Sequence, residues 1–345
     1  MPRKIGGMGE GPAIVVDNVV KHFGDVRALQ GISFDVAAGT VFGLLGPNGA
    51  GKTTAVRILA TVLAPDGGRA TVLDLDVVRQ ADEVRRRIGL AGQNAAVDPN
   101  LTGRENLRMI GLLSQLPRDR IMPRAGELLE RFSLSAAADR PLRTYSGGMR
   151  RRLDVAASLV ARPEVLFLDE PTTGLDLTSR NQLWDMIREL VNEGTTVLLT
   201  TQYLEEADRL AGRVAVVDDG RVIANDTPGR LKAELGDTVI EMEVRDESRA
   251  GRAFELLGRR FGGGVEREDH RLRITSDQGA SVLIAALRAL GDEGLEPDTL
   301  TVREPSLDDV FLALTGRHAE DGEPKEAAES SPPAGRRRAK RRGAG

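Results

Sequence analysis

A glycine-rich segment of the sequence has the residue types and spacing that bind phosphate. The stretch Gly46-Pro-Asn-Gly-Ala-Gly-Lys-Thr53 fits the pattern G-x-x-x-x-G-K-[ST]. Glycines lack a Cβ atom, so this loop can adopt left-handed backbone angles and bring its N–H groups close to phosphate oxygens. We expect Lys52 to reach the β- and γ-phosphates of a nucleotide, and the Thr53 hydroxyl to bind Mg²⁺. The predicted nucleotide contacts in this segment are Gly46, Pro47, Asn48, Gly49, Ala50, Gly51, Lys52, Thr53 and Thr54.

Two adjacent carboxylates follow an apolar run later in the chain. Residues Val165 to Leu168 are uniformly apolar, and Asp169 and Glu170 come directly after them. Such a run suits a central parallel strand, whose C-terminal end opens at the edge of the sheet where ligands bind. Asp169 is placed to hold Mg²⁺ through water, and Glu170 is placed to orient and deprotonate an attacking water. The alternative, that Asp-Glu-Pro merely ends a strand, is much weaker beside the glycine-rich loop.

A Ser-Gly-Gly segment lies upstream of those carboxylates, in Tyr145-Ser-Gly-Gly-Met149. Ser146 can cap a helix that we predict from Gly147 to Ala161, and the N–H groups at the start of that helix form an anion site. The chain's own phosphate loop does not need this second site. Because the chain holds one copy of each motif, two complete sites require two chains related by a two-fold axis.

The elements that must position these motifs are predicted from apolar runs and periodicity. A buried strand is predicted from Thr40 to Leu45, entering the glycine-rich loop. A helix is predicted from Thr53 to Ala64, leaving the loop with the positive end of its dipole towards the phosphates. A further strand is predicted from Thr195 to Thr201. Residues 12–45 alternate short strands with turns, and residues 94–162 are mostly helical.

Together the motifs resemble those of the nucleotide-binding subunits of ABC transporters, over about residues 12–230. The resemblance identifies residues 46–53 as the Walker A loop, Gln93 as the Q-loop and residues 145–149 as the signature. It identifies residues 165–169 as the Walker B strand and residues 174–176 as the D-loop. It implies an α/β fold of the P-loop NTPase class, made of an ABC ATPase domain at 12–230. That domain would contain an antiparallel β subdomain and a helical subdomain at 94–162, which carries the signature.

The resemblance also assigns roles to single residues. In that family the signature contacts the γ-phosphate held by the opposite subunit, so Ser146, Gly147 and Gly148 inherit this contact. Nucleotide contacts are implied for Gln93 and Asp176, and Mg²⁺ contacts for Thr53, Gln93 and Asp169. The implied catalytic residues are Glu170, Lys52 and Gln202, and the implied ligands are ATP and Mg²⁺.

Three positions depart from the family pattern. The signature is YSGGM in place of the usual LSGGQ, which leaves its Ser-Gly-Gly core intact. The aromatic residue expected to stack on adenine is Phe23 in place of tyrosine, and a buried strand residue is the alternative interpretation. Gln202 replaces the switch histidine that follows the strand ending at Thr201. A carboxamide can donate a hydrogen bond to the γ-phosphate but carries no positive charge, so we hypothesise slower hydrolysis.

The subtype is indicated by the signature, by Gln202-Tyr-Leu-Glu-Glu-Ala-Asp208 and by the late segment Leu307 to Gly316. These are similar to the daunorubicin/doxorubicin-resistance type of drug-export ATPase. The resemblance implies a homodimer on the cytoplasmic face of the cell membrane, bound peripherally to integral membrane permease subunits that bind most of the hydrophobic cargo. The alternatives are an exporter of a lipid, polysaccharide or peptide, and a soluble ABC ATPase acting in DNA repair or on ribosomes. The Ser-Gly-Gly segment argues against a P-loop kinase or GTPase.

The family resemblance also suggests where a membrane subunit docks. An apolar cluster follows Gln93, in the neighbourhood that accepts a coupling helix in that family. We expect this segment to be partly exposed, with a locally buried loop as the alternative. The residues of the cluster are Ala95, Ala96, Val97, Pro99 and Leu101.

Composition narrows the remaining function classes. The 345 residues carry 48 basic and 52 acidic side chains, a net charge of −4, which argues against a general nucleic-acid-binding surface. There is no cysteine, which is compatible with a reducing compartment. Residues 1–11 are predicted to be disordered and lack the apolar core of a signal peptide. No stretch approaches the ~20 apolar residues that a membrane-spanning helix needs, so the pore of a transporter would come from another polypeptide.

The chain after the ATPase domain predicts a small accessory domain at 237–316. The pattern indicates a strand at 238–244, a helix at 248–260, a hairpin at 265–275 turning near Asp269, a helix at 280–290 and a strand at 298–303. This β-α-β-β-α-β order suggests a ferredoxin-like or related α+β domain, followed by a last helix at 306–314. Its role is predicted as dimer contact, permease docking or regulation, with plain stabilisation as the alternative. Residues 319–345, basic at their end, are predicted to be a disordered tail.

Overall fold

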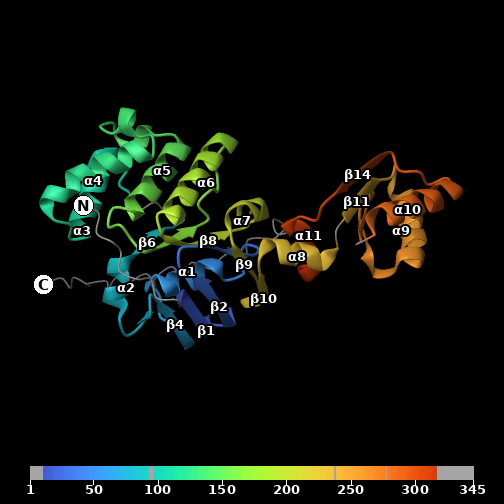
Figure 1. The fold of residues 1–345 in the computed structure, drawn as a ribbon, viewed down its shortest axis with the longest axis horizontal. Helices are drawn as coiled ribbons and strands as arrows, with labels where there is room; N and C mark the ends of the chain where they lie inside the picture. The colour runs from blue at the N-terminus through green and yellow to red at the C-terminus, as the bar shows by residue number, and fades with distance from the viewer. Residues whose placement is uncertain (1–10, 93–96, 237, 277, 317–345) are drawn as a thin grey trace, which may run out of the picture.

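A six-stranded sheet forms the centre of the larger of two bodies in the computed structural model, which describes residues 11–92, 97–236, 238–276 and 278–316 (Figure 1). The strand order is β10-β9-β3-β8-β7-β6, and all neighbours are parallel except β9 and β10. Every residue of β3, β7 and β8 is buried, as expected for parallel strands covered on both faces. The strands span Val41–Leu45 (β3), Ile88–Ala91 (β6), Val165–Asp169 (β7), Thr196–Thr201 (β8), Arg213–Asp218 (β9) and Arg221–Asp226 (β10).

An antiparallel sheet, ordered β2-β1-β4-β5, also belongs to the larger body and lies to one side of the six-stranded sheet (Figure 1). Its strands span Pro12–Phe23 (β1), Val26–Ala37 (β2), Gly67–Val72 (β4) and Leu75–Asp76 (β5). The predicted antiparallel subdomain is therefore confirmed, but β1 and β2 are 12 residues long each, not short. Irregularities in their pairing, such as the one between Val16 and Val19, let so long a pair bend and twist.

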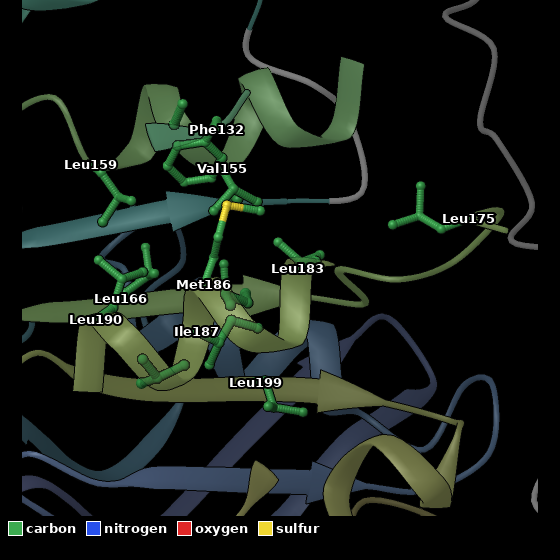
Figure 2. Close-up of a cluster of buried hydrophobic side chains, with 14 of the residues drawn as sticks. Phe132, Val155, Leu159, Leu166, Leu175, Leu183, Met186, Ile187, Leu190 and Leu199 are labelled. Atoms are coloured by element: carbon green, nitrogen blue, oxygen red, sulfur yellow. The ribbon is translucent and has the colours of Figure 1, made fainter. Parts of the chain in front are cut away.

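Helices complete the larger body. They span Lys52–Leu59 (α1), Ala81–Arg87 (α2), Gly103–Leu113 (α3), Arg118–Arg131 (α4), Gly147–Ser158 (α5), Leu177–Asn192 (α6), Leu204–Leu210 (α7) and Pro228–Leu235 (α8). The predicted helical segment at 94–162 corresponds to α3, α4 and α5 with short 3₁₀ turns. Figure 2 shows how side chains of α5 and α6 meet those of β7 and β8 in one apolar cluster, which includes Val155, Met186, Leu166 and Leu199.

Two helices end earlier than predicted. Helix α1 stops at Leu59 because Thr61 adopts a left-handed φ of 62° and the Val62 and Leu63 amides both donate to the Arg57 carbonyl. Helix α5 stops at Ser158, where the Leu159 and Val160 amides bond to the carbonyls three residues before them, and Arg162, just before Pro163, then adopts a left-handed φ of 54°.

A four-stranded antiparallel sheet, ordered β12-β13-β11-β14, forms the smaller body at the opposite end of the molecule (Figure 1). Its elements span Thr238–Glu243 (β11), Glu247–Phe261 (α9), Val265–Glu268 (β12), Arg271–Ser276 (β13), Gly279–Asp292 (α10) and Thr299–Arg303 (β14). The predicted β-α-β-β-α-β order is confirmed, and the strand order is that of a ferredoxin-like sheet. The hairpin turns at Asp269, whose φ is 49°.

The last helix, α11 (Leu307–Thr315), packs on the larger body, although we predicted it as part of the smaller one. Its Leu307, Val310 and Phe311 side chains join the same apolar cluster as Leu204 of α7 and Leu231 of α8. The helix follows the last strand of the smaller sheet, so it ties that sheet to the larger body.

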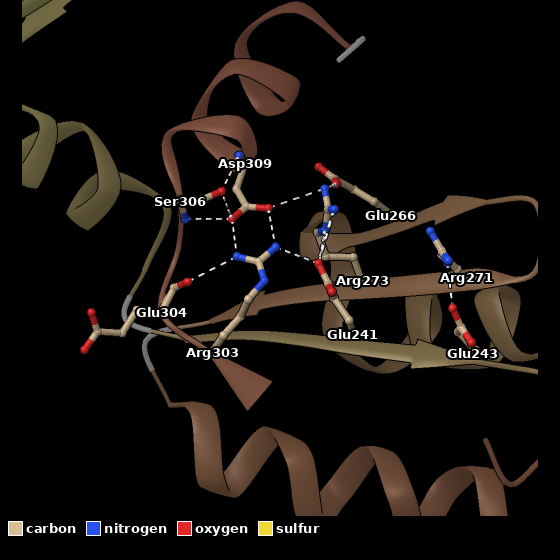
Figure 3. Close-up of polar contacts among 9 residues, drawn as sticks. All are labelled: Glu241, Glu243, Glu266, Arg271, Arg273, Arg303, Glu304, Ser306 and Asp309. Carbon is tan, nitrogen blue, oxygen red and sulfur yellow. Dashed lines mark hydrogen bonds and ion pairs between the residues drawn. The ribbon is translucent and has the colours of Figure 1, made fainter. Parts of the chain in front are cut away.

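A polar network holds α11 to the smaller sheet (Figure 3). Asp309, which is 2% exposed at its side chain, accepts hydrogen bonds of 2.6 and 2.9 Å from the Arg303 guanidinium. Ser306 caps the helix and bonds the same carboxylate, while Arg273 lies 3.5 Å from it. Glu241 accepts a 2.6 Å bond from Arg303.

In the part of the chain that the structure describes, none of the helices combines the length and the apolar character that crossing a membrane requires.

Candidate active site

The glycine-rich loop connects β3 to α1, and its glycines are required by their surroundings. Gly46, Gly49 and Gly51 have φ angles of 150°, 81° and 106°, which side-chain-bearing residues rarely adopt. A Cβ atom at Gly46 would collide with the Val217 carbonyl oxygen, and one at Gly51 with the Ala28 carbonyl oxygen. At Gly49 no described atom lies within 4 Å of such a position. The loop is thus packed at both ends and open in the middle, which suits a phosphate cradle at the start of α1.

Lys52 lies under this loop and is 4% exposed. Its Nζ donates to the Gly46 carbonyl at 2.6 Å and to the Pro47 carbonyl at 2.9 Å. Burial lowers the pKa of Lys52, and the nearby Glu170 and Asp169 carboxylates oppose that shift. Two of the three ammonium donors are fixed by the loop, leaving one N–H to donate to a phosphate oxygen.

Asp169 ends β7 and is 3% exposed. One of its carboxylate oxygens, Oδ1, accepts a 3.1 Å bond from the Thr53 hydroxyl and a 2.6 Å bond from the Thr200 hydroxyl. The pairing of β7 with β8 places Asp169 directly opposite Thr200. The hydroxyl of Thr53 and the carboxylate of Asp169 are oxygen ligands of the kind that Mg²⁺ prefers, and their contact fits the predicted metal site.

Glu170 follows with a strained backbone. Its φ of 49° is left-handed and uncommon for a residue with a side chain. Its N–H is held at 3.1 Å by the Thr200 carbonyl and also at 3.1 Å by the Thr200 hydroxyl. The side chain is partly buried, with the Thr173 hydroxyl 3.5 Å from Oε2. The strain turns Glu170 out of the strand direction at the edge where ligands bind.

The Ser-Gly-Gly segment begins α5, as predicted. Ser146 stands at the N-cap, and its Oγ accepts a 3.2 Å bond from the Met149 amide. Ser146 and Gly147 are exposed, and the first amides of the helix have no acceptor within it. A Cβ atom at Gly148 would lie 2.6 Å from Ser179 Oγ, so glycine permits the close approach of α5 and α6.

Asp176 has a structural partner in the described chain. It caps α6, accepting a 2.8 Å bond from the Ser179 amide and a 3.1 Å bond from the Ser179 hydroxyl. These bonds hold the pKa of the Asp176 carboxyl below its usual range. Asp176 is exposed, next to Leu177, which is 66% exposed. Through Ser179, the cap lies beside Gly148 of the signature helix.

Comparison with known proteins decides the family. The model of the ABC transporter family matches residues 29–173. Daunorubicin resistance ATP-binding protein DrrA2 of Streptomyces coeruleorubidus is 53% identical, over 92% of this chain and 100% of the relative. The chain belongs to the ABC transporter ATP-binding proteins. Daunorubicin/doxorubicin resistance ATP-binding protein DrrA of Streptomyces peucetius is 50% identical over 92% of this chain and 96% of its own. Nod factor export ATP-binding protein I of Ralstonia nicotianae is 39% identical over 91% of this chain and 97% of its own length.

Solved structures give the same fold. The cbiO1 protein from Clostridium perfringens, part of an ABC transporter complex, is 28% identical with a TM-score of 0.60, covering 65% of this chain and 92% of that one. An ATP-binding cassette of an ABC transporter in its ADP conformation is 27% identical with a TM-score of 0.57, covering 63% and 91%. The predicted P-loop NTPase fold is confirmed, and the chain is an ATPase of the ABC type that binds ATP and ADP.

The structure locates two other predicted residues of the ABC ATPase, Phe23 and Gln202. Phe23, at the end of β1, is 47% exposed, so its interpretation as a buried strand residue is wrong. The Lys21 ammonium lies 5.6 Å from the centre of its ring. Gln202 occupies a half-buried bend directly after β8. Gln93 lies outside the described residues, and its predicted role stays a prediction.

The apolar cluster predicted near Gln93 is exposed only in part. Ala95 and Ala96 lie outside the described residues. Val97 is 9% exposed and belongs to the main apolar cluster, so it is not available at the surface. Pro99 is exposed and Leu101 half-buried. The described part of the segment is thus partly exposed, as predicted, and Val97 is its buried member.

Two residues that sequence reasoning missed form hydrogen bonds with the segment that carries Asp169 and Glu170. Thr200 contacts both Asp169 and Glu170, and Arg151 of α5 donates to the Asp169 carbonyl. Thr200 is one of two threonines that end β8, and Arg151 is the middle of three arginines in a row. The types and positions of these residues carry no signal by themselves. Only the register of β7 with β8 and the placement of α5 make them part of the site.

Proposed function

We propose that this ABC ATPase is the motor of an exporter that removes a hydrophobic drug from the cell. Two copies would act together on the cytoplasmic face of the membrane and drive separate integral membrane permease subunits. The relatives at 50% and 53% identity are named for daunorubicin resistance, and they align along almost their whole length. This similarity covers the smaller body as well as the ATPase body, which supports a drug-exporter ATPase of the same type.

The arrangement of Lys52, Asp169 and Glu170 is the observation that carries the catalytic proposal. Lys52 Nζ donates to the γ-phosphate and offsets the negative charge of the transition state. Glu170 accepts a proton from a water molecule as the water oxygen bonds to the γ-phosphorus. The bond from that phosphorus to the bridging oxygen breaks, and ADP carries the electron pair away. The strained Glu170 backbone, held by Thr200, supports this assignment because strain of this kind gathers at functional sites.

Thr53 and Asp169 would hold Mg²⁺. When bound, this ion supplies positive charge that neutralises the phosphate oxygens. The protein's own part is to keep both oxygen ligands in place: Thr200 fixes the Asp169 carboxylate, and the first turn of α1 fixes Thr53. Gln202 would donate its amide N–H to the γ-phosphate, and Phe23 would stack on the adenine ring.

The exposed start of α5 supports a two-subunit site. Ser146 uses its hydroxyl oxygen as an internal cap, and its O–H remains able to donate. The Gly147 and Gly148 amides point out of the helix end, where the helix dipole favours an anion. We assign this surface to the γ-phosphate bound by the partner subunit, and Asp176 to the interface beside it. ATP would then join the two subunits, and hydrolysis would release them.

A different cargo is the second candidate. The Nod factor export relative shares 39% identity over 91% of the chain, so the same motor architecture is found with another named cargo. The cargo contacts belong to the permease in either case. Reconstituting the ATPase with its permease in vesicles separates the candidates. Daunorubicin or a similar drug should stimulate ATP hydrolysis and accumulate inside inverted vesicles; stimulation by a lipid or oligosaccharide alone would favour the second candidate.

The mechanism is tested by replacing Glu170 with glutamine, which keeps the shape of the side chain but removes the base. The Glu170→Gln protein should bind ATP, lose hydrolysis and accumulate as an ATP-loaded dimer in size-exclusion chromatography with light scattering. Glu189→Gln is the matched control, because Glu189 is a carboxylate of the surface of α6. A Glu170→Gln protein that hydrolyses ATP normally, or stays monomeric with ATP bound, would contradict the mechanism.

A further inference from the structure

Arg151 of α5 joins three separate segments around the catalytic carboxylates. Its Nε donates to the Pro171 carbonyl at 2.8 Å, and its Nη2 donates to the Asp169 carbonyl at 2.9 Å. Its Nη1 donates to the Gly92 carbonyl at 2.6 Å and to Asp154 Oδ2 at 3.1 Å. The Asp169 and Pro171 carbonyls lie on either side of Glu170 in the chain. One side chain of the signature helix therefore grips the backbone both before and after the proposed base.

The sheet explains why one guanidinium can make these contacts. Strands β6 and β7 are parallel neighbours, with Ala91 opposite Leu168, so Gly92 and Asp169 emerge at the same edge. A planar guanidinium presents five N–H donors in a fixed fork, and these can serve several carbonyls at once. The ammonium of lysine is a point charge and cannot reproduce that fork.

The Arg151 side chain is largely buried, which limits the groups that it can contact. Its side chain is 12% exposed, and that of Asp154 is 2% exposed. Burial lowers the pKa of Arg151, while the Asp154 and Asp169 carboxylates oppose the shift, and the guanidinium stays protonated. A buried cation whose bonds go mainly to backbone carbonyls has little freedom to take other partners. Its position is thus set by the segments that it connects.

We propose that Arg151 is a positioning residue that transmits contact at the signature to the catalytic base of the same subunit. Ser146 caps α5, and Arg151 lies in the same rigid helix. A partner subunit's nucleotide that engages Ser146 displaces or fixes α5, and Arg151 passes that movement to the backbone on both sides of Glu170. The inference rests on the proposed two-subunit mechanism and adds the link between the two sites of the dimer.

Arg152, the next residue on α5, offers a matched control. Its Nη1 donates at 3.1 Å to the Phe132 carbonyl, inside the helical lobe and away from the carboxylates. Replacement of Arg152 by glutamine removes a half-buried cation and a bond to a backbone carbonyl, as replacement of Arg151 does. It should leave Glu170 untouched. The comparison therefore separates a loss of catalytic positioning from a general loss of structure.

The test uses the full-length chain as wild type, Arg151→Gln, Arg151→Lys and Arg152→Gln. Turnover, KM for ATP and the melting temperature are measured for each. We expect Arg151→Gln to lower kcat by about 10- to 100-fold, with KM changed less than about threefold, because small misplacement of a catalytic group is costly. Arg151→Lys should fall between Arg151→Gln and wild type. Arg152→Gln should lower the melting temperature without lowering kcat.

Hydrogen–deuterium exchange adds a readout of position. Peptides covering residues 88–92 and 165–175 should exchange faster in Arg151→Gln, whereas peptides near Phe132 should exchange faster in Arg152→Gln. Unchanged kcat in Arg151→Gln, or an equal loss of kcat in Arg152→Gln, would overturn the inference. A wild-type protein that hydrolyses ATP as a monomer would instead contradict the proposed two-subunit function.

Discussion

The Thr200 hydroxyl donates a 2.6 Å hydrogen bond to the Asp169 carboxylate, across the parallel pairing of β8 and β7. The same oxygen accepts a 3.1 Å bond from the Glu170 amide. One buried hydroxyl thus orients the predicted metal ligand and the proposed base together. Neither contact can be read from the local sequence, since both depend on which strand lies beside β7.

Replacement of Thr200 by valine should slow hydrolysis more than it harms folding. Valine keeps the shape of the side chain but loses both bonds, so we expect kcat to fall by about 10- to 100-fold and the free energy of unfolding by about 1–2 kcal/mol. Steady-state kinetics and urea unfolding measure the two effects. Thr196→Val is the control: Thr196 is also buried in β8, but its hydroxyl accepts from the Gly39 amide at the other end of the strand. Equal loss of kcat in both variants would refute a specific role for Thr200.

Gln202 lies directly after β8, at the position where the family pattern has a histidine. A carboxamide donates a hydrogen bond but brings no charge to the γ-phosphate. The Gln202→His variant should hydrolyse ATP at least as fast as wild type. It should gain most near pH 6, where imidazole is largely protonated. Initial rates from pH 6 to 8 test this, with Gln202→Ala as the variant that loses the donor. A large loss of rate in Gln202→His would refute the hypothesis of slow hydrolysis.

Much of the site was predictable because its residues lie next in sequence to the strands and helices that position them. The loop at 46–53 and the strand ending at Asp169 are each specified by a continuous run, so β3 and β7 begin and end within one residue of their predicted bounds. Helix ends were less predictable, as the left-handed Thr61 shows. Contacts made by residues distant in the chain, such as Arg151 to Gly92, have no local signal at all.

The role of α11 was missed for the same physical reason. The sequence predicts a helix at 306–314, but it does not tell which body the apolar face of that helix covers. Phe311 belongs to the apolar cluster that contains Leu204 and Leu231, whereas Asp309 accepts hydrogen bonds from Arg303 of the smaller sheet. One helix therefore serves both bodies of the chain.

Replacement of Asp309 by asparagine should weaken this junction in a pH-dependent way. Burial alone would raise the pKa of Asp309, but bonds from Arg303 and Ser306 outweigh it, and the pKa is lowered. A lowered carboxyl pKa stabilises the fold at neutral pH, and this contribution is lost as the pH falls through the lowered value. At pH 7 we expect Asp309→Asn to cost about 3 kcal/mol, because Arg303 and Arg273 lose the buried one of the two carboxylates that they share, and then share only Glu241. Urea unfolding should show the difference from wild type narrowing as the pH falls below about 4. Asp308→Asn, on the exposed face, is the control, and a pH-independent difference would contradict the assignment.

Glu206 of α7 should show the opposite dependence on pH. Its carboxyl is fully buried and accepts a 3.0 Å bond from Trp184 Nε1. Among the described residues, Glu206 Oε2 and Thr172 Oγ1 are both buried, and neither makes a hydrogen bond of good geometry. Burial raises the pKa of Glu206, against the opposing effects of Trp184, Thr201 and Thr172 and the charge of Arg180.

A raised carboxyl pKa means that the folded state holds the proton more tightly than the unfolded chain. Stability from this group is therefore full below the unfolded pKa and is lost as the pH rises through the folded value. In Glu206→Gln the amide keeps an acceptor for Trp184 and offers N–H donors towards Thr172, with no charge to bury. We expect it to exceed wild type in stability by on the order of 1 kcal/mol above neutral pH and to match it near pH 4. Fluorescence of Trp184, the single tryptophan, can follow urea unfolding at each pH. Glu205→Gln, on the exposed face of α7, is the control, and a Glu206→Gln protein less stable than wild type at every pH would show that the ionised carboxylate is the stabilising form.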